Sequence, residues 1–111
     1  MNYKVPVTAA ALFLAIAGSA HAQSKIPSIT SLWDETRLSQ RECNQRAEQA
    51  MRNAGFTRIE TIGQTTFGDR TDYQVGFRCV ESKGIYYIFG GGPDEPVVRR
   101  YIDELKNAFN R

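Results

Sequence analysis

Residues 72–80 read DYQVGFRCV, and this stretch decides the fold. Its apolar and polar side chains alternate, which is the period-two pattern of a half-buried β-strand. The apolar face holds Tyr73, Val75, Phe77 and Cys79. The opposite face holds Asp72, Gln74, Gly76 and Arg78. We therefore expect a central strand with one buried and one exposed face.

Two more strands are predicted beside it. Residues 58–67 are rich in Thr and Ile, and a single strand there would place Ile59, Thr61, Thr65 and Phe67 on one side and Ile62 on the other. Residues 68–70 supply a turn into the central strand, and residues 81–84 supply a turn out of it. Residues 85–89 form a continuous apolar run that the glycines at 90–92 should end. Short links make the three strands an antiparallel meander.

A helix is predicted on each side of this meander. Ser39 and Glu42 form a capping box, and Gly55 is placed to end the first helix. Its apolar face holds Cys43, Ala47, Ala50, Met51 and Ala54. The second helix follows Asp94 or Glu95, and its apolar stripe holds Val97, Val98, Tyr101, Ile102, Leu105, Ala108 and Phe109.

The two cysteines of the chain fit one disulfide. Cys43 lies on the apolar face of the first helix, and Cys79 lies on the apolar face of the central strand. A bond between them would hold this helix across the sheet. We expect an α+β fold with two layers, helix–three-stranded antiparallel meander–helix, with both helices on one sheet face and a single α-β-β-β-α domain over residues 39–111.

Residues 1–22 have the three parts of a signal peptide. Lys4 precedes an apolar run at residues 5–17, and residues 20–22 offer the small side chains that a signal peptidase reads. We expect cleavage before Gln23 and export, with the periplasm favoured over full secretion. A disulfide is stable in such compartments outside the cytoplasm. Once the signal is cleaved, no stable membrane insertion is expected.

Residues 23–38 show no clear period and are predicted to be an N-terminal arm or linker. Leu32 and Trp33 could dock this arm on the domain. A short helical turn after Ser31, an arm swapped between two copies and a free leader are the alternatives.

Composition excludes several function classes. Removing residues 1–22 from the 111-residue chain leaves 89 residues, and the loss of Lys4 leaves 13 Lys and Arg against 12 Asp and Glu. A formal charge of +1 gives no long-range field for nucleic acid. The sole histidine, His21, lies in the signal, so the exported chain lacks the residue on which catalytic triads and most zinc sites depend. No catalytic, metal or cofactor motif is found, and no cofactor is expected.

The polar face of the central strand is the first candidate binding site. We predict a sheet-face site made of Gln74, Gly76, Arg78, Tyr86 and Ile88, with Ile62 nearby. Aromatic residues and Arg are frequent hot spots of protein interfaces, and a mid-strand glycine lets another backbone approach. The alternative is a sheet face that is simply exposed to water.

A glycine-rich loop and a set of carboxylates are two further candidate sites. Residues 90–96 resemble a phosphate loop in glycine content, but Asp94 and Glu95 occupy the place of the anion, so a flexible connection is the simpler interpretation. Asp69, Asp72 and Glu81 could act as paired carboxylates of a small hydrolase.

These observations favour a non-enzymatic exported binding module. Its partner would be another exported protein or a small ligand, and an inhibitor or immunity-type protein is one specific form of this hypothesis. A structural or dimerisation domain, in which two sheets pack face to face as a homodimer, is the first alternative. A small carboxylate-dependent hydrolase is the second.

Overall fold

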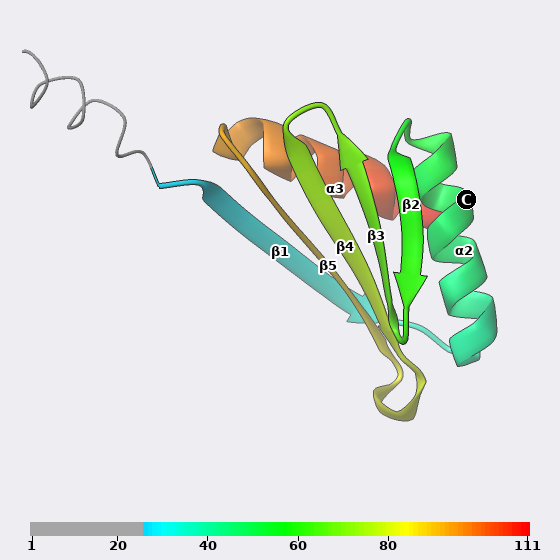
Figure 1. The fold of residues 1–111 in the computed structure, drawn as a ribbon. Coiled ribbons are helices and arrows are strands. Elements are labelled where there is room, and N and C mark those ends of the chain that lie inside the picture. Colours follow the sequence, from blue (N-terminus) through cyan, green and yellow to red (C-terminus); the bar gives the residue numbers. More distant parts are fainter. Residues whose placement is uncertain (1–25) are drawn as a thin grey trace, which may run out of the picture.

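The computed structural model describes residues 26–111, so the predicted signal peptide and its cleavage site lie outside the described residues. The elements follow in the order β1 (Ser28–Glu35), α2 (Gln40–Asn53), β2 (Thr57–Ile62), β3 (Thr65–Arg70), β4 (Tyr73–Val80), a 3₁₀ turn (Glu81–Lys83), β5 (Ile85–Gly92) and α3 (Glu95–Phe109). The five strands form one antiparallel sheet in the order β1-β5-β4-β3-β2 (Figure 1).

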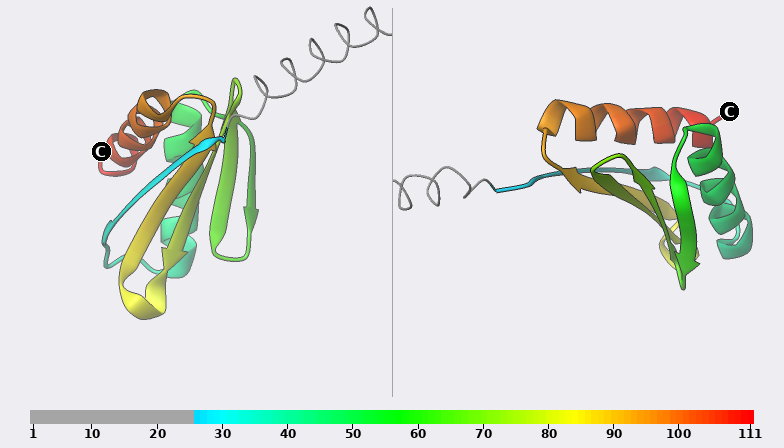
Figure 2. Two further views of the ribbon diagram at one scale, coloured as in Figure 1. Left: turned by 90° about the vertical axis from the view of Figure 1, so that its left-hand side faces the viewer. Right: turned by 45° about the horizontal axis from the view of Figure 1, so that its top comes forward.

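Both helices lie on the same face of this sheet, as the turned views show (Figure 2). We call the face that α2 and α3 cover the inner face and the opposite face the outer face. Within residues 26–111 no element covers the outer face. The predicted α+β class, the two layers and the placement of both helices on one side are confirmed, but the sheet has five strands instead of three.

The first predicted strand is two strands. Gly63 adopts a left-handed φ of 63°, and the chain reverses between β2 and β3. The reversal puts Thr65 and Phe67 on the same side as Ile62, so their predicted grouping with Ile59 was wrong. Residues 68–70, predicted as a turn, continue β3, and the chain turns at residues 71–72 instead.

The predicted arm contains the fifth strand. Ser28–Glu35 pairs with β5 along its whole length, with Leu32 opposite Ile88 and Trp33 opposite Tyr87. The partner segment includes Gly90, Gly91 and Gly92, which extend β5 instead of ending it. This pairing joins residues 50 to 64 positions apart, a separation that local sequence patterns do not report.

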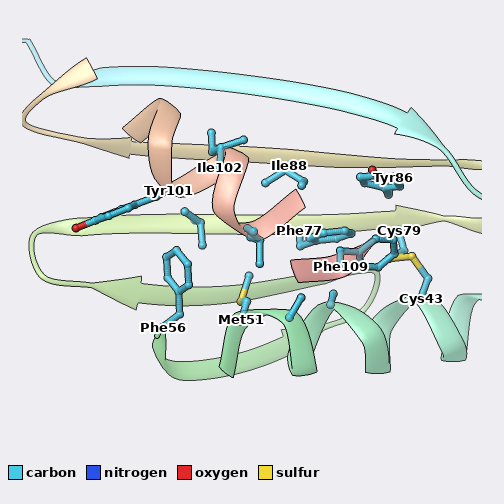
Figure 3. Packing of buried hydrophobic residues seen from close by; sticks show 14 of the residues in the cluster. Cys43, Met51, Phe56, Phe77, Cys79, Tyr86, Ile88, Tyr101, Ile102 and Phe109 are labelled. Atoms are coloured by element: carbon cyan, nitrogen blue, oxygen red, sulfur yellow. A yellow bond between two sulfur atoms is a disulfide. The ribbon is translucent and has the colours of Figure 1, made fainter. Parts of the chain in front are cut away.

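The inner face and the helices enclose the core. Phe77, Tyr86 and Phe109 form an aromatic cluster with ring centroids 4.5–5.1 Å apart, beside the disulfide (Figure 3). The predicted Cys43–Cys79 disulfide is present, with a Cα–Cα distance of 6.0 Å. It joins α2 to β4, which fixes the first helix across the centre of the sheet.

The predicted capping box also starts α2. The Ser39 hydroxyl accepts a hydrogen bond from the Glu42 N–H at 3.2 Å, and the Glu42 carboxylate accepts one from the Ser39 N–H at 3.4 Å. Gly55 follows the helix with a left-handed φ of 83°. These local signals determine where the helix begins and ends.

Candidate functional site

The exposed large apolar residues of the described chain gather on one side of the molecule. They are Ile26, Ile29, Trp33, Ile62 and Tyr87. Strand register places the last four on the outer face, and Ile26 lies two residues before β1. Trp33 is 61% exposed and Ile29 is 78% exposed. The outer face is therefore apolar at several positions that no other part of residues 26–111 covers.

One row of side chains crosses the outer face from edge to edge. The register aligns Trp33, Tyr87, Arg78, Thr65 and Ile62 on the five successive strands. The Arg78 guanidinium donates to the Thr65 hydroxyl at 3.1 Å and to the side-chain oxygen of Gln64 at 2.9 Å. No carboxylate of residues 26–111 lies within salt-bridge distance of it. Arg78 thus presents an oriented charge without an acidic partner in this part of the chain, beside Tyr87 and one strand away from Ile62.

A second row shows why β4 carries a glycine. Gly76 lies between Phe67 and Phe89, whose rings meet edge to face at 6.4 Å. A Cβ on Gly76 would come within 2.3 Å of Cζ of Phe89. The Phe89 ring therefore covers the strand at this point, an arrangement by which aromatic residues protect strand glycines. Gly76 lies on the outer face as predicted, but the expected approach of another backbone there is wrong because the ring occupies the space.

A groove of ≈ 920 Å³ opens at the end of the outer face where β1 begins. Phe67 and Phe89 line its apolar part together with Ile26 and Ile29. Gln74 and Gly91 also line the groove, in the same cross-strand row as Ile29. Ligand sites are commonly grooves of this size with mainly apolar walls and a few polar groups.

The polar rim of the groove combines both signs of charge. Arg58 forms a salt bridge with Asp69 at 2.5 Å, and Asp72 lies beside them in the turn before β4. Arg58 has a left-handed φ of 51° at an irregularity of the β2–β3 register, which carries its side chain toward Asp69. The groove therefore has no strong excess of either charge.

Five residues were predicted to form the sheet-face site, and the structure brings three of them together on the outer face. Gln74, Gly76 and Arg78 share the outer face. Tyr86 and Ile88 do not, because both are buried in the core, at 1% and 0% exposure. A run of five apolar residues has no alternation, so the sequence does not reveal which of its residues point inward.

The residues that occupy the expected places are Tyr87 and Phe89. The predicted disulfide could have indicated that Tyr87 and Phe89 face outward. Tyr86 pairs directly with Cys79 across the two strands, and directly opposed residues share a face. Combining the disulfide with this register would have assigned Tyr86 to the core and Tyr87 to the surface.

Tyr86 has an unusual environment for a tyrosine. Its hydroxyl makes no hydrogen bond within residues 26–111. Burial raises the pKa of Tyr86 above its ordinary value, and the Asn110 side chain opposes this shift without reaching hydrogen-bond geometry. Tyr86 is thus a core residue that contributes to stability and lies away from the groove.

The carboxylates considered for catalysis are separated. Asp69 and Asp72 both line the groove. Glu81 lies at the other end of β4 and accepts a hydrogen bond from the Gln40 N–H at 2.6 Å, which caps α2. The structure therefore removes Glu81 from any paired-acid site and gives it a structural role.

Residues 26–111 carry neither a metal-binding cluster nor a membrane-spanning helix. Residues 26–111 contain no group of three or more His, Cys, Asp or Glu side chains that could hold a metal ion. No helix in this range has the length and apolar character needed to span a membrane. Residues 90–92, considered as a phosphate loop, pair within the sheet as part of β5.

Comparison with known proteins adds no assignment. No protein-family model matches the chain, and no curated protein matches it significantly.

Proposed function

We propose that the chain is a small exported binding module without enzymatic activity, and that its outer face holds a segment of another exported protein. The observation that carries this proposal is the gathering of the exposed large apolar residues on the sheet face that the helices leave open. Contiguous apolar patches on soluble proteins commonly mark interaction sites. Export is part of the proposal, and the Cys43–Cys79 disulfide is compatible with it.

The chemistry of the face indicates what the partner presents. Arg78 is held by two hydrogen bonds to neutral groups and has no acidic partner within residues 26–111. A carboxylate on the partner would complete a charge-assisted pair there. Tyr87 on one side of Arg78, and Ile62 beyond Thr65 on the other, favour apolar neighbours for that carboxylate. The groove beside Phe89 can take an apolar side chain of the same segment.

Site-specific photo-cross-linking tests this proposal. A photoreactive amino acid is placed at Ile62, on the outer face, and at Asp103, on the exposed side of α3, in the exported protein. We expect the Ile62 position to give one defined adduct with a second envelope protein. The Asp103 position should give none. Equal labelling from both positions, or no adduct from Ile62, contradicts the proposal.

A charge series at Arg78 sharpens the test. Arg78→Lys should keep part of the adduct, whereas Arg78→Glu should abolish it because two carboxylates would then face each other. Arg78 lies on the exposed side of β4, so neither variant should unfold the domain. An adduct that is indifferent to Arg78→Glu would place the contact elsewhere.

The small hydrolase is kept as a second candidate because Asp69 and Asp72 both line the groove. Two carboxylates across a groove are the minimum for glycoside hydrolysis. The salt bridge from Arg58 holds Asp69 in a fixed ion pair, which suits a stabilising role better than proton transfer. Asp72→Asn separates the two candidates, since a hydrolase would lose turnover whereas the Ile62 adduct should remain.

A further inference from the structure

We propose that two copies of this chain form a symmetric dimer in which their β1 strands pair antiparallel, centred on Ser31, and join the two five-stranded sheets into one. The proposal rests on the backbone of β1 and does not depend on whether the outer face binds another protein. The occupant is a second copy because the free hydrogen-bonding groups of β1 are complementary to themselves.

The free edge of β1 can be assigned residue by residue. Along an antiparallel strand, alternate residues direct N–H and C=O to the same side. The Thr36 N–H donates to the Gly84 carbonyl at 2.9 Å and continues the β1–β5 register. Residues of β1 with even numbers therefore bond to β5. Those with odd numbers, Ile29, Ser31, Trp33 and Glu35, direct their backbone groups to the open edge.

The opposite end of the sheet gives the same assignment independently. The Cys79 N–H donates to the Gln64 carbonyl at 2.9 Å, which continues the β3–β4 register. Odd residues of β4 therefore bond to β3, and even residues of β4 bond to odd residues of β5. Even residues of β5 are then left to bond to β1, with Ile88 opposite Leu32.

The run of free groups has a defined length. At one end the Glu35 N–H is already bound by the Asp34 carboxylate at 2.8 Å. At the other end Pro27 has no N–H. Ile29, Ser31 and Trp33 remain, and they are symmetric about Ser31. An antiparallel copy with Ser31 opposite the partner's Ser31 bonds Ile29 to the partner's Trp33 and uses all of these groups.

Side-chain chemistry favours this register over its neighbours. The exposed Ile29 faces the partner's Trp33 on the outer face, so both lose exposed apolar area. On the inner face Thr30 faces the partner's Leu32, and Ser28 faces the partner's Asp34. No pair of like charges is opposed in this register. A register centred on Leu32 would oppose Ile29 to the partner's Glu35, and one centred on Thr30 would oppose Trp33 to the partner's Pro27.

Isologous pairing of this kind closes on itself, because one strand edge serves both copies. The joined sheet places the exposed Trp33 of each copy beside the axis. A long edge strand without Pro or Lys attracts further strands when it stays open, and natural proteins avoid such edges or cover them. The second copy supplies the cover that residues 26–111 lack.

The experiment measures self-association of the oxidised protein purified after export. A dilution series in the analytical ultracentrifuge should show a reversible monomer–dimer equilibrium. Trp33 is the only tryptophan of the chain, so its emission reports the interface directly. We expect the emission to shift to shorter wavelength as the dimer forms, because an exposed indole becomes packed against the partner's Ile29.

Substitutions at Ser31 decide the register. Ser31→Pro removes the central edge N–H and should leave a monomer at every concentration. Ser31→Lys and Ser31→Asp should each raise the dimer dissociation constant roughly fivefold, because like charges then face each other across the axis. An equimolar mixture of these two should restore association as a mixed dimer. Glu60→Lys, on the other edge strand, is the matched control and should change nothing.

Two results would overturn the proposal. One is a monomer at the highest soluble concentration with unshifted Trp33 emission. The other is a dimer that survives the Ser31 variants and fails with Ile62→Ser, since that dimer would pack through the outer faces. If Ser31→Pro does not fold, the Lys and Asp pair still decides the outcome. The Ile62 cross-link is read separately, so a failed dimer does not count against the binding function.

Discussion

The two faces of the sheet differ in what they contribute to the molecule. The inner face is closed by two helices, a disulfide and an aromatic cluster, and its large side chains are nearly all buried. The outer face leaves Ile29, Trp33, Ile62 and Tyr87 exposed and holds Arg78 in a fixed orientation by neutral hydrogen bonds. We infer that the inner face provides folding stability and that the outer face can vary for binding at little cost in stability.

Removing the disulfide, which lies on the inner face, should give the largest loss in the free energy of unfolding. Replacing both Cys43 and Cys79 by Ala opens a loop with a sequence separation of 36 residues. The chain-entropy model predicts a loss of about 4 kcal/mol in the free energy of unfolding. Urea denaturation with a spectroscopic readout measures it. A loss below about 1 kcal/mol would mean that packing alone holds α2 against β4.

The same Gly→Ala substitution can be made on each face of the sheet, so the two losses of stability can be compared directly. Gly92 lies on the inner face, where a Cβ would come within 2.1 Å of Cδ2 of Tyr73, whose ring packs on Tyr101 at 5.2 Å. Gly92→Ala should cost about 1–3 kcal/mol, because the Tyr73 ring has to move against the core. Gly76→Ala should cost less, because it displaces only the end of the Phe89 ring, which borders the open groove.

Thermal unfolding of both glycine variants under identical buffer gives the comparison. Equal losses for Gly76→Ala and Gly92→Ala would mean that the outer face is packed as tightly as the inner one. A larger loss for Gly76→Ala would reverse the assignment of the two faces to binding and to stability.

Tyr86 is an inner-face position at which a substitution should increase stability instead of reducing it. Its buried hydroxyl lacks a hydrogen-bond partner in the described chain, so Tyr86→Phe should raise the free energy of unfolding by about 1 kcal/mol. The pKa of Tyr86 is raised by burial, so the folded state keeps its proton longer than the unfolded state. The wild type should therefore lose stability as the pH rises above 10.0, the ordinary value for tyrosine.

Measuring stability against pH for wild type and Tyr86→Phe isolates this contribution. The difference between the two proteins should be constant below that pH and should grow above it. A difference that shrinks at high pH would mean that the phenolate is stabilised in the folded state, contrary to the burial of the group.

The sequence predicts the features that depend on residues close together in the chain or on a covalent bond. The capping box at Ser39, the alternation of residues 73–79 and the cysteine pair are local or covalent, so α2, β4 and the disulfide were predicted correctly. The pairing of residues 28–35 with β5 depends on contacts that no local pattern encodes. β1 was therefore missed, and with it the edge strand and the part of the outer face that carries Trp33.

The candidate site was predicted only in part for a related reason. Gln74 and Arg78 were placed correctly because they alternate with buried residues. Tyr86 was misplaced because its neighbours are all apolar, and inward or outward direction then depends on strand register. The groove needs β1, β3 and β5 together, so no local sequence pattern indicates it.

The smallest expected effect belongs to the outer face and tests its role most directly. Ile62 is 59% exposed, so Ile62→Ser should change the free energy of unfolding by no more than about 0.5 kcal/mol. Ile88→Val, a smaller chemical change on the inner face, should cost about 0.5–1.5 kcal/mol because Ile88 is fully buried. If Ile62→Ser leaves stability intact but removes cross-linking from a photoreactive residue at Tyr87, which is exposed on the same face, the Ile62 side chain serves association and not folding. A stability loss as large as that of Ile88→Val would instead make Ile62 part of the packing of the domain. The exposed apolar residues of the outer face would then no longer support a binding surface.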